Sequence, residues 1–197
     1  MGSKTGSRRV LIVAAHASQE TFGSALAAAY AAAATAAGHD VRLLELDRLA
    51  FDPILHHAYQ VVQELEADLK TAQEHIKWAD HLVFAYPVWW GSIPALLKGF
   101  LDRIMLPGFA FKYRKGKAFP EKLLSGRSAH LLVTMDTPPW YFRLVYRAPA
   151  IHQMKKTTLE FCGVTPVKTL MCGPVLDSTP DKRRAWLDQA RALAARI

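Results

Sequence analysis

The sequence predicts an α/β fold in which helices cover both faces of a five-stranded, doubly wound parallel sheet with strand order 2-1-3-4-5. Three observations lead to this prediction. Short apolar runs alternate with longer segments of helical periodicity along the chain. The runs are continuously apolar, as in strands that are buried on both faces. Right-handed crossover connections then favour this strand order.

Length and composition predict one domain with a substantial core, because the chain has 197 residues and 51% of them are hydrophobic. Residues 1–8 are polar and basic, so we expect them to form a mobile tail. Residues 9–197 are expected to be the domain, since no repeat or long linker divides them.

The chain begins with a strand, a helix and a second strand. Residues 9–15 (RVLIVAA) are aliphatic and β-branched, which is typical of a central strand. Residues 24–37 are rich in alanine and are followed by Gly38, so they predict a helix with glycine after its end. Residues 41–46 are expected to form the second strand.

Another helix, strand and helix follow a loop at Asp52-Pro53. Residues 59–78 are expected to be helical, and residues 81–86 predict a third buried strand. Residues 94–105 predict a helix with Ser92 as its N-cap, one residue short of the arrangement in which proline takes the first helical position. Within this helix, Asp102 and Arg103 are expected to face solvent or an interface.

The remaining elements complete the alternating pattern. Residues 129–134 predict the fourth strand, and the helix at residues 150–161 is expected to stop at Gly163. Residues 164–171 predict the fifth strand, and residues 181–196 a final helix.

The formal net charge of +8 is spread along the chain, and no nucleic-acid-binding motif organises it. We therefore expect no nucleic-acid partner, and we expect the charge to attract anionic small molecules such as phosphorylated cofactors.

Cys162 and Cys172 are too few for a disulfide framework, which favours a reducing cytoplasm. The apolar run near the N-terminus is far shorter than the roughly 20 residues that span a bilayer, so no membrane insertion is expected.

In a sheet of this kind, ligands bind beyond the carboxyl ends of the strands, beside the switch between strands one and three. The loop after strand one, HASQETFGS, lacks the G-x-G-x-x-G fingerprint of an ordinary nicotinamide site. Its hydroxyls at Ser18, Thr21 and Ser24 open a helix, whose positive end can hold a phosphate, and His16 adds a further polar group. The alternative is that Ser18 or Thr21 simply caps the helix.

The loop after strand three, YPVWWGS, places Trp89 and Trp90 side by side. Neighbours in an extended backbone point to opposite sides, so one ring can pack inward while the other lines the crevice. Gly91 allows a planar ligand to approach the chain closely, and a flavin fits this description. The alternative is that both tryptophans belong to the core or to a dimer interface. No histidine, cysteine or carboxylate cluster predicts a metal site; His56 and His57 stand alone.

Three segments resemble the NAD(P)H:quinone oxidoreductase family, the flavodoxin-like relatives of DT-diaphorase and modulator of drug activity B. They are LIVAAHASQETFGSAL, YPVWWGSIPALLKGFLDRIMLPGFAF and EFCGV. The resemblance implies a flavodoxin-like fold and a flavin-dependent enzyme that passes two electrons from NAD(P)H to a quinone or similar electrophile by a ping-pong mechanism. It also implies a homodimer with each flavin at the subunit interface. FAD is the expected cofactor, and FMN remains open.

The resemblance further implies roles for single residues. The phosphate end of the flavin would be held by His16, Ser18, Thr21, Phe22 and Gly23, and its ring would be lined by Pro87, Val88, Trp89, Trp90 and Gly91. Gly23 stands where the family often has asparagine, which removes one side-chain contact and leaves the backbone donors in place.

The loop after strand four, TMDTPPWYF, departs from the Thr-Gly-Gly-like stretch of the family. Because its two prolines lack N–H groups, any backbone donation to the flavin must come from Met135, Asp136 or Thr137. The carboxylate of Asp136 would oppose an anionic reduced flavin, so we expect it to make a turn or a cap.

In the family, a tyrosine and a histidine from this region stabilise the reduced flavin; the candidates here are Tyr141, Tyr146 and His152. The aromatic residues 140–142 are otherwise expected to form a lid or to contact a partner subunit. Because this loop is substituted, a second function stays open. Similar proteins are cytoplasmic ancillary subunits of glutathione-gated potassium-efflux systems.

Overall fold

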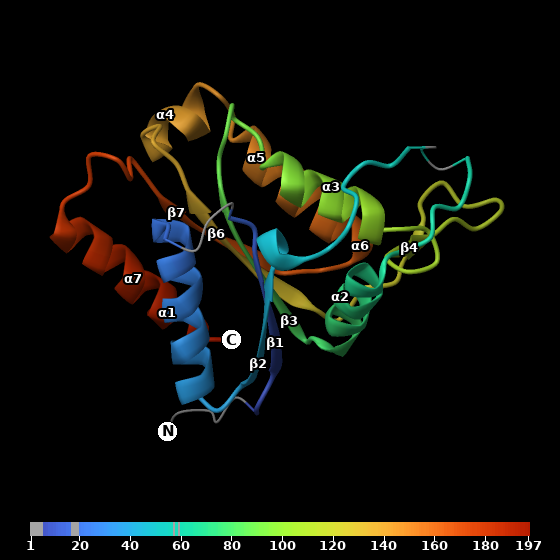
Figure 1. Cartoon of the computed structure of the whole chain (residues 1–197), viewed down its shortest axis with the longest axis horizontal. Coiled ribbons are helices and arrows are strands. Elements are labelled where there is room, and N and C mark those ends of the chain that lie inside the picture. Colours follow the sequence, from blue (N-terminus) through green and yellow to red (C-terminus); the bar gives the residue numbers. More distant parts are fainter. Residues whose placement is uncertain (1–5, 17–19, 57, 59) are drawn as a thin grey trace.

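A five-stranded parallel sheet runs through the computed structural model, which describes residues 6–16, 20–56, 58 and 60–197 (Figure 1). Its strands are β1 (Arg9–Ala14), β2 (Asp40–Glu45), β3 (His81–Pro87), β6 (Ser128–Thr134) and β7 (Val167–Cys172). They lie in the order β2-β1-β3-β6-β7, and all neighbours are parallel. The predicted fold class and strand order are confirmed.

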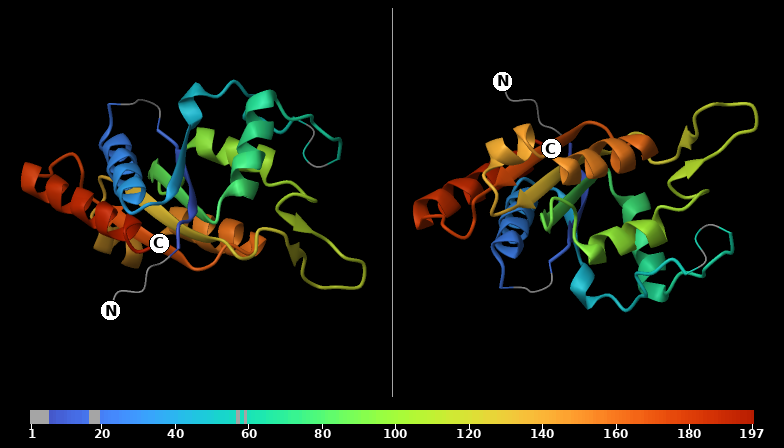
Figure 2. Two further views of the ribbon diagram at one scale, coloured as in Figure 1. Left: turned by 90° about the horizontal axis from the view of Figure 1, so that it is seen from below. Right: turned by 90° about the horizontal axis from the view of Figure 1, so that it is seen from above.

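Helices cover both faces of this sheet, as Figures 1 and 2 show. On one face lie α1 (Phe22–Ala36) and α7 (Pro180–Ala194), whose apolar side chains pack on β1, β3 and β6. The other face is covered by α2 (Ala67–Trp78), α3 (Ala95–Ile104) and a continuous helical segment formed by α5 (Pro149–His152), the π-helical η2 (Gln153–Leu159) and α6 (Glu160–Cys162). The core therefore has two halves, one on each side of the sheet.

The remaining elements are short. They are the 3-10 turn η1 (Leu46–Arg48), the helix α4 (Pro139–Leu144), and an antiparallel pair formed by β4 (Phe111–Lys112) and β5 (Glu121–Lys122). This hairpin extends away from the body of the molecule in Figure 2. None of the helices in the described part of the chain combines the length and the apolar character needed to cross a bilayer.

Several predicted boundaries are wrong. The helix expected at residues 59–78 begins only at Ala67, and residues 60–66 are not helical. Ser92 is not the N-cap of α3, because that position is occupied by Pro94, while Ser92 forms backbone hydrogen bonds with Trp89. The fifth strand starts at Val167, three residues later than expected. Neither α4 nor the hairpin was predicted. The predicted tail, residues 1–8, lies largely outside the described residues.

The expectation that Arg103 faces solvent or an interface is also wrong, because its side chain is only 1% exposed. Its guanidinium donates to the Glu66 carboxylate at 2.8 and 3.1 Å, to the Glu64 carbonyl at 2.9 Å and to the Asp52 carbonyl. These bonds fix Glu64 and the N-cap residue Glu66 just before the start of α2. On the same helix, Gly99 lies so close to Pro53 that a Cβ atom would be 2.6 Å from its carbonyl oxygen.

Candidate functional site

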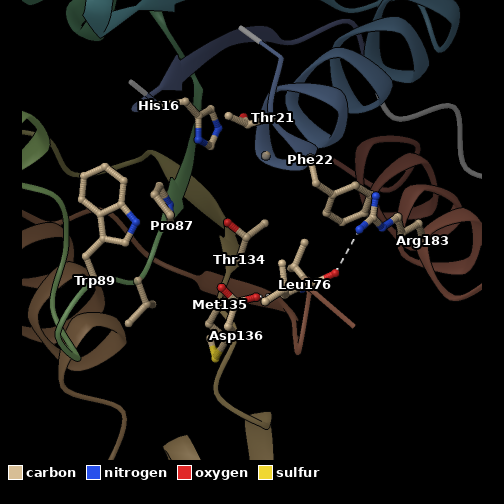
Figure 3. Close-up of a pocket in the computed structure, with 13 residues that line it drawn as sticks. His16, Thr21, Phe22, Pro87, Trp89, Thr134, Met135, Asp136, Leu176 and Arg183 are labelled. Carbon is tan, nitrogen blue, oxygen red and sulfur yellow. Dashed lines mark hydrogen bonds between the residues drawn. The ribbon is translucent and has the colours of Figure 1, made fainter. Parts of the chain in front are cut away.

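A cavity of about 380 Å³ opens at the carboxyl end of the sheet, beside the switch between β1 and β3 (Figure 3). This volume falls in the range of about 300 to 1,000 Å³ that is typical of small-molecule sites. We call it the first cavity. Its lining residues are His16, Thr21, Phe22, Gly23, Pro87, Val88, Trp89, Thr134, Met135, Asp136, Val175, Leu176 and Arg183.

The first loop meets this cavity through the start of α1. Thr21 is the N-cap of α1, and its Oγ1 accepts a hydrogen bond from the Ser24 amide at 3.1 Å. The threonine thus caps the helix and lines the cavity at the same time. Ser24 does not line the first cavity; it lines a neighbouring hollow of about 450 Å³. Ser18 lies outside the described residues.

The imidazole of His16 is packed against the start of α1 and is only 5% exposed. Burial lowers the pKa of His16, and a hydrogen bond with the Gly23 backbone and the negative charge of Asp47 oppose this shift in part. The ring therefore favours its neutral form. Its Nε2 atom is buried and has no hydrogen-bond partner among the described residues.

The tryptophan pair lies in a tight turn. The Trp89 amide donates to the Ser92 carbonyl at 3.0 Å, and the Ser92 amide donates to the Trp89 carbonyl at 2.9 Å. Both central residues have positive φ, 52° for Trp90 and 76° for Gly91, which is the pattern of a type I′ turn. A left-handed conformation costs a bulky residue about 1–2 kcal/mol, so the remaining structure must hold Trp90 at the tip.

Neither tryptophan belongs to the core of the chain, because Trp89 is half exposed and Trp90 is fully exposed. The expectation that one of them packs inward is therefore wrong for the single chain. Trp89 lines the first cavity, whereas Trp90 lines a second cavity of about 550 Å³. Val88 lines both, so the two cavities adjoin.

The second cavity brings the third loop together with the residues around α4. It is lined by Val88, Trp90, Gly91, Thr137, Phe142, Tyr146 and Pro149. The Ala150 amide donates to the Gly91 carbonyl at 3.1 Å and so ties the turn to the start of α5. The lining contains no charged side chain, which suits an uncharged aromatic ligand.

The fourth loop is shared between the two cavities, since Met135 and Asp136 line the first and Thr137 lines the second. The Oδ1 atom of Asp136 accepts a hydrogen bond from the Leu176 amide at 2.8 Å, as expected for a capping carboxylate. Pro139 starts α4, which buries Phe142 completely. The loop that departs from the family pattern thus builds one wall of the second cavity.

The three catalytic candidates lie in different places. Tyr146 lines the second cavity and is half exposed. Tyr141 packs edge-to-face on Tyr146, with ring centroids 5.0 Å apart, but lines neither cavity. His152, at the end of α5, is exposed and also lines neither cavity.

Sequence reasoning missed four lining residues, Thr134, Val175, Leu176 and Arg183. Arg183 comes from the first turn of α7, more than 160 residues after His16. Its guanidinium donates to the Val175 carbonyl at 3.1 Å and to the Ser178 hydroxyl at 2.8 Å, and lies 5.9 Å from the centroid of the Phe22 ring (Figure 3). The sequence contained only a basic run at residues 182–184, with no sign that one member faces the cavity.

The first cavity combines an apolar wall with a polar region. Val88, Trp89 and Met135 give an apolar wall for a planar ring. The N-terminus of α1, the unpartnered nitrogen of His16 and the cation of Arg183 provide a polar region for a phosphorylated tail. Within the described residues, no group of three histidine, cysteine, aspartate or glutamate side chains is arranged to hold a metal ion.

Comparisons with known proteins agree with this architecture. A family model described as flavodoxin-like fold matches residues 8–196. NAD(P)H dehydrogenase (quinone) 1 of Cavia porcellus is 26% identical over 204 residues, covering 89% of this chain and 72% of that protein. An uncharacterized NAD(P)H oxidoreductase of Haemophilus influenzae is 27% identical and covers 91% of both chains. The structure of an NAD(P)H:quinone oxidoreductase from Methanothermobacter marburgensis superimposes with a TM-score of 0.83, at 25% identity, over 96% of this chain and 98% of that one.

Proposed function

Since the chain belongs to the flavodoxin-like family of the NAD(P)H:quinone oxidoreductases, we propose that it is a flavin-dependent enzyme that transfers two electrons from NAD(P)H to a quinone or a similar electrophile. The observation that carries the proposal is the first cavity, with an apolar aromatic wall at one end and a polar region beside α1 at the other. Electrons can pass from a nicotinamide cofactor to a quinone at this site only if both molecules contact the same bound flavin.

The residues of the first cavity would hold the flavin. Trp89 and Val88 would flank the ring, and the start of α1 with His16 and Arg183 would face the tail. A bound flavin supplies the chemistry of accepting and passing on a hydride, while the protein positions it and sets its electrostatic surroundings. Asp136 already accepts a hydrogen bond from the Leu176 amide, so its negative charge is partly satisfied within the chain.

We propose FAD as the cofactor, with FMN as the alternative. The segment from His16 to Gly23 resembles the FAD-using branch of the family, and Arg183 offers a cation for a second phosphate. Denaturing the purified protein and identifying the released flavin by chromatography against both standards decides between the two.

The second cavity is the proposed place for nicotinamide and acceptor, which would occupy it in turn. It adjoins the first cavity at Val88, and its aromatic walls suit flat, uncharged rings. Tyr146 is the best-placed candidate for a hydrogen bond to the ligand, and Tyr141 would hold the ring of Tyr146 in position. A ping-pong mechanism predicts parallel double-reciprocal plots, whereas intersecting plots would contradict it.

Exposed apolar side chains around the second cavity support a homodimer. Trp90, Trp140, Leu144, Val145 and Tyr146 are all at least half exposed, and such a cluster is costly to leave in water. We propose that a second copy of the chain covers it, which analytical ultracentrifugation tests directly.

Two buried free thiols, Cys162 and Cys172, fit a cytoplasmic protein.

The decisive experiment for the proposed function has two readouts. The visible absorption spectrum of the purified protein is expected to show a bound flavin, and NADH or NADPH is expected to be oxidised rapidly when a quinone is present. Bound flavin with negligible turnover would favour the potassium-efflux subunit instead. The oxidoreductase names of the relatives reported above favour the enzyme. A colourless protein that takes up neither FAD nor FMN would overturn both functions.

Replacing Trp89 with alanine is expected to weaken flavin binding about fivefold or more, because a stacked aromatic contact contributes about 1 kcal/mol beyond its buried area. The melting temperature of the flavin-free protein is expected to change little, since the side chain is half exposed. Phe119→Ala is the control, because Phe119 is an exposed aromatic residue that lines neither cavity and lies outside the cluster assigned to the dimer. Equal losses of flavin affinity in the two variants would argue against a flavin beside Trp89.

A further inference from the structure

The imidazole of His16 occupies the space that a side chain at position 23 would need. A Cβ atom built on Gly23 would lie 2.1 Å from His16 Cε1 and 2.7 Å from both ring nitrogens, far inside van der Waals contact. Alanine at position 23 and the observed imidazole position therefore exclude each other.

Glycine at this position is needed for space and not for backbone conformation. Gly23 is not among the residues with positive φ, and it lies in the first turn of α1. Glycine inside a helix costs about 1 kcal/mol relative to alanine, and the rest of α1 is rich in alanine. The helix on its own would thus be more stable with alanine here, so the benefit of glycine must come from the ring beside it.

The position of this ring has a consequence for ligand binding. Only 5% of the surface of His16 is exposed, and its Nε2 atom has no hydrogen-bond partner among the described residues. A buried polar atom without a partner is costly in a folded protein, and a ligand that supplies the partner removes this cost. Both His16 and Gly23 line the first cavity beside the N-cap residue Thr21.

We propose that Gly23 is a positioning residue that seats the imidazole of His16 against the start of α1, where the ring and the helix N-terminus together bind the ribityl-phosphate tail of the cofactor. This inference rests on the proposed flavin function and assigns to Gly23 a role beyond that of a backbone donor. On this proposal, Gly23 affects cofactor binding only through the position of the His16 ring.

A double-mutant cycle tests this coupling. Dissociation constants for FAD and FMN are measured by flavin fluorescence in the wild type, Gly23→Ala, His16→Ala and the double variant. We expect each single variant to bind flavin about tenfold more weakly, as for the loss of one hydrogen bond to a charged group. The double variant is expected to bind no more weakly than His16→Ala alone. Ala25→Gly, in the same helical turn, controls for helix propensity and is expected to keep the wild-type affinity.

Two further measurements on the flavin-free protein test the seating of the ring itself. The melting temperature of Gly23→Ala is expected to equal or exceed that of the wild type, since the ring moves and the helix gains alanine. The imidazole nitrogen signals of His16, observed by NMR, are expected to shift in Gly23→Ala and to stay unchanged in Ala25→Gly.

The outcomes separate this inference from the proposed function. If the wild type binds neither FAD nor FMN, the proposed function fails and the inference fails with it. If the wild type binds flavin but Gly23→Ala keeps its affinity, only the inference is overturned. Full additivity of the two losses in the double variant would also overturn it, because Gly23 would then act independently of His16.

Discussion

Arg103→Met is expected to lower the free energy of unfolding by about 3 kcal/mol, because it removes the buried cation of an ion pair whose carboxylate is one third exposed and also removes the donor to two backbone carbonyls. The side chain of Arg103 is 1% exposed, and its guanidinium binds the carboxylate of Glu66 together with two backbone carbonyls. Methionine keeps most of the apolar stem but leaves the Asp52 and Glu64 carbonyls without this donor, while the Glu66 carboxylate still accepts from the Asp52 amide at 3.1 Å. The chain at Glu64 and Glu66, which these bonds tie to α3, is expected to become mobile.

Chemical denaturation with urea measures this effect, and the exposed ion pair on the same helix provides the control. Lys98 and Asp102 form this pair at 2.6 Å, and both side chains are more than one third exposed. Lys98→Met is expected to change stability by less than about 1 kcal/mol, as for surface ion pairs in general. If the two variants lose equal stability, the buried pair contributes no more than an exposed one. Protection of the Asp52 amide, which donates to the Oε1 atom of Glu66 at 3.1 Å, from hydrogen exchange is expected to fall only in the Arg103 variant.

Acidification is expected to destabilise the fold steeply between pH 6.5 and pH 4.5 through two buried histidines. His81 is 1% exposed and His130 is 4% exposed. The hydroxyl of Tyr30 forms hydrogen bonds with Nε2 of His81 at 3.1 Å and with Nδ1 of His130 at 2.7 Å. Burial lowers the pKa of His81 to about 3, helped by the nearby His130. Burial also lowers the pKa of His130 to about 4, helped by the charge of Lys168.

The direction of the effect follows from which state binds protons first. In the unfolded chain both histidines titrate near pH 6.5, whereas in the folded protein they stay neutral until pH 4 or below. Their stabilising contribution is therefore complete above pH 6.5 and is lost as the pH falls toward their native pKa values. Two such groups give a slope of roughly 3 kcal/mol per pH unit, so on the order of 5 kcal/mol is lost by pH 4.5.

Urea denaturation at a series of pH values measures this slope. His130→Asn keeps a polar group beside Tyr30 but does not titrate, so the slope between pH 6.5 and pH 4.5 is expected to fall by about one half. Above about pH 7.5 the two proteins are expected to show the same slope, because His81 and His130 are then neutral in both the folded and the unfolded state. His16 and His75, whose pKa values are also lowered by burial, act in the same direction in both proteins. A slope that His130→Asn leaves unchanged would contradict this assignment.

The strand order and the position of the cavity could be predicted from the sequence because they depend on local patterns. Buried strands such as β1 and β3 are continuous apolar runs, and the carboxyl ends of parallel strands must meet at one edge of the sheet. Once the order of elements was known, the loops around His16 and Trp89 had to lie side by side. Both line the first cavity, as this reasoning requires.

Other parts of the site depend on contacts between residues that are far apart in the chain. Arg183 reaches the cavity only because α7 packs beside α1, and nothing in its own neighbourhood of the sequence indicates this. The backbone conformation of Trp90 follows from a tight turn that is tied to Ala150, nearly 60 residues away. These features depend on tertiary packing, which cannot be inferred from a short stretch of sequence.

Arg103 and Gly23 show most clearly where local reasoning ends. From the sequence Arg103 was expected to face solvent or an interface, yet Glu64, Glu66 and Asp52 surround it in the folded chain. The sequence placed Gly23 in the loop before a helix, yet in the structure it lies in the first turn of α1 and leaves room for an imidazole. Hydrophobic periodicity predicts the secondary structure, and with it the sheet order, because the spacing of apolar residues along the chain decides which of them share one face of a helix or strand. The partner of a charge and the space beside a glycine exist only after the sheet and its helices have packed together.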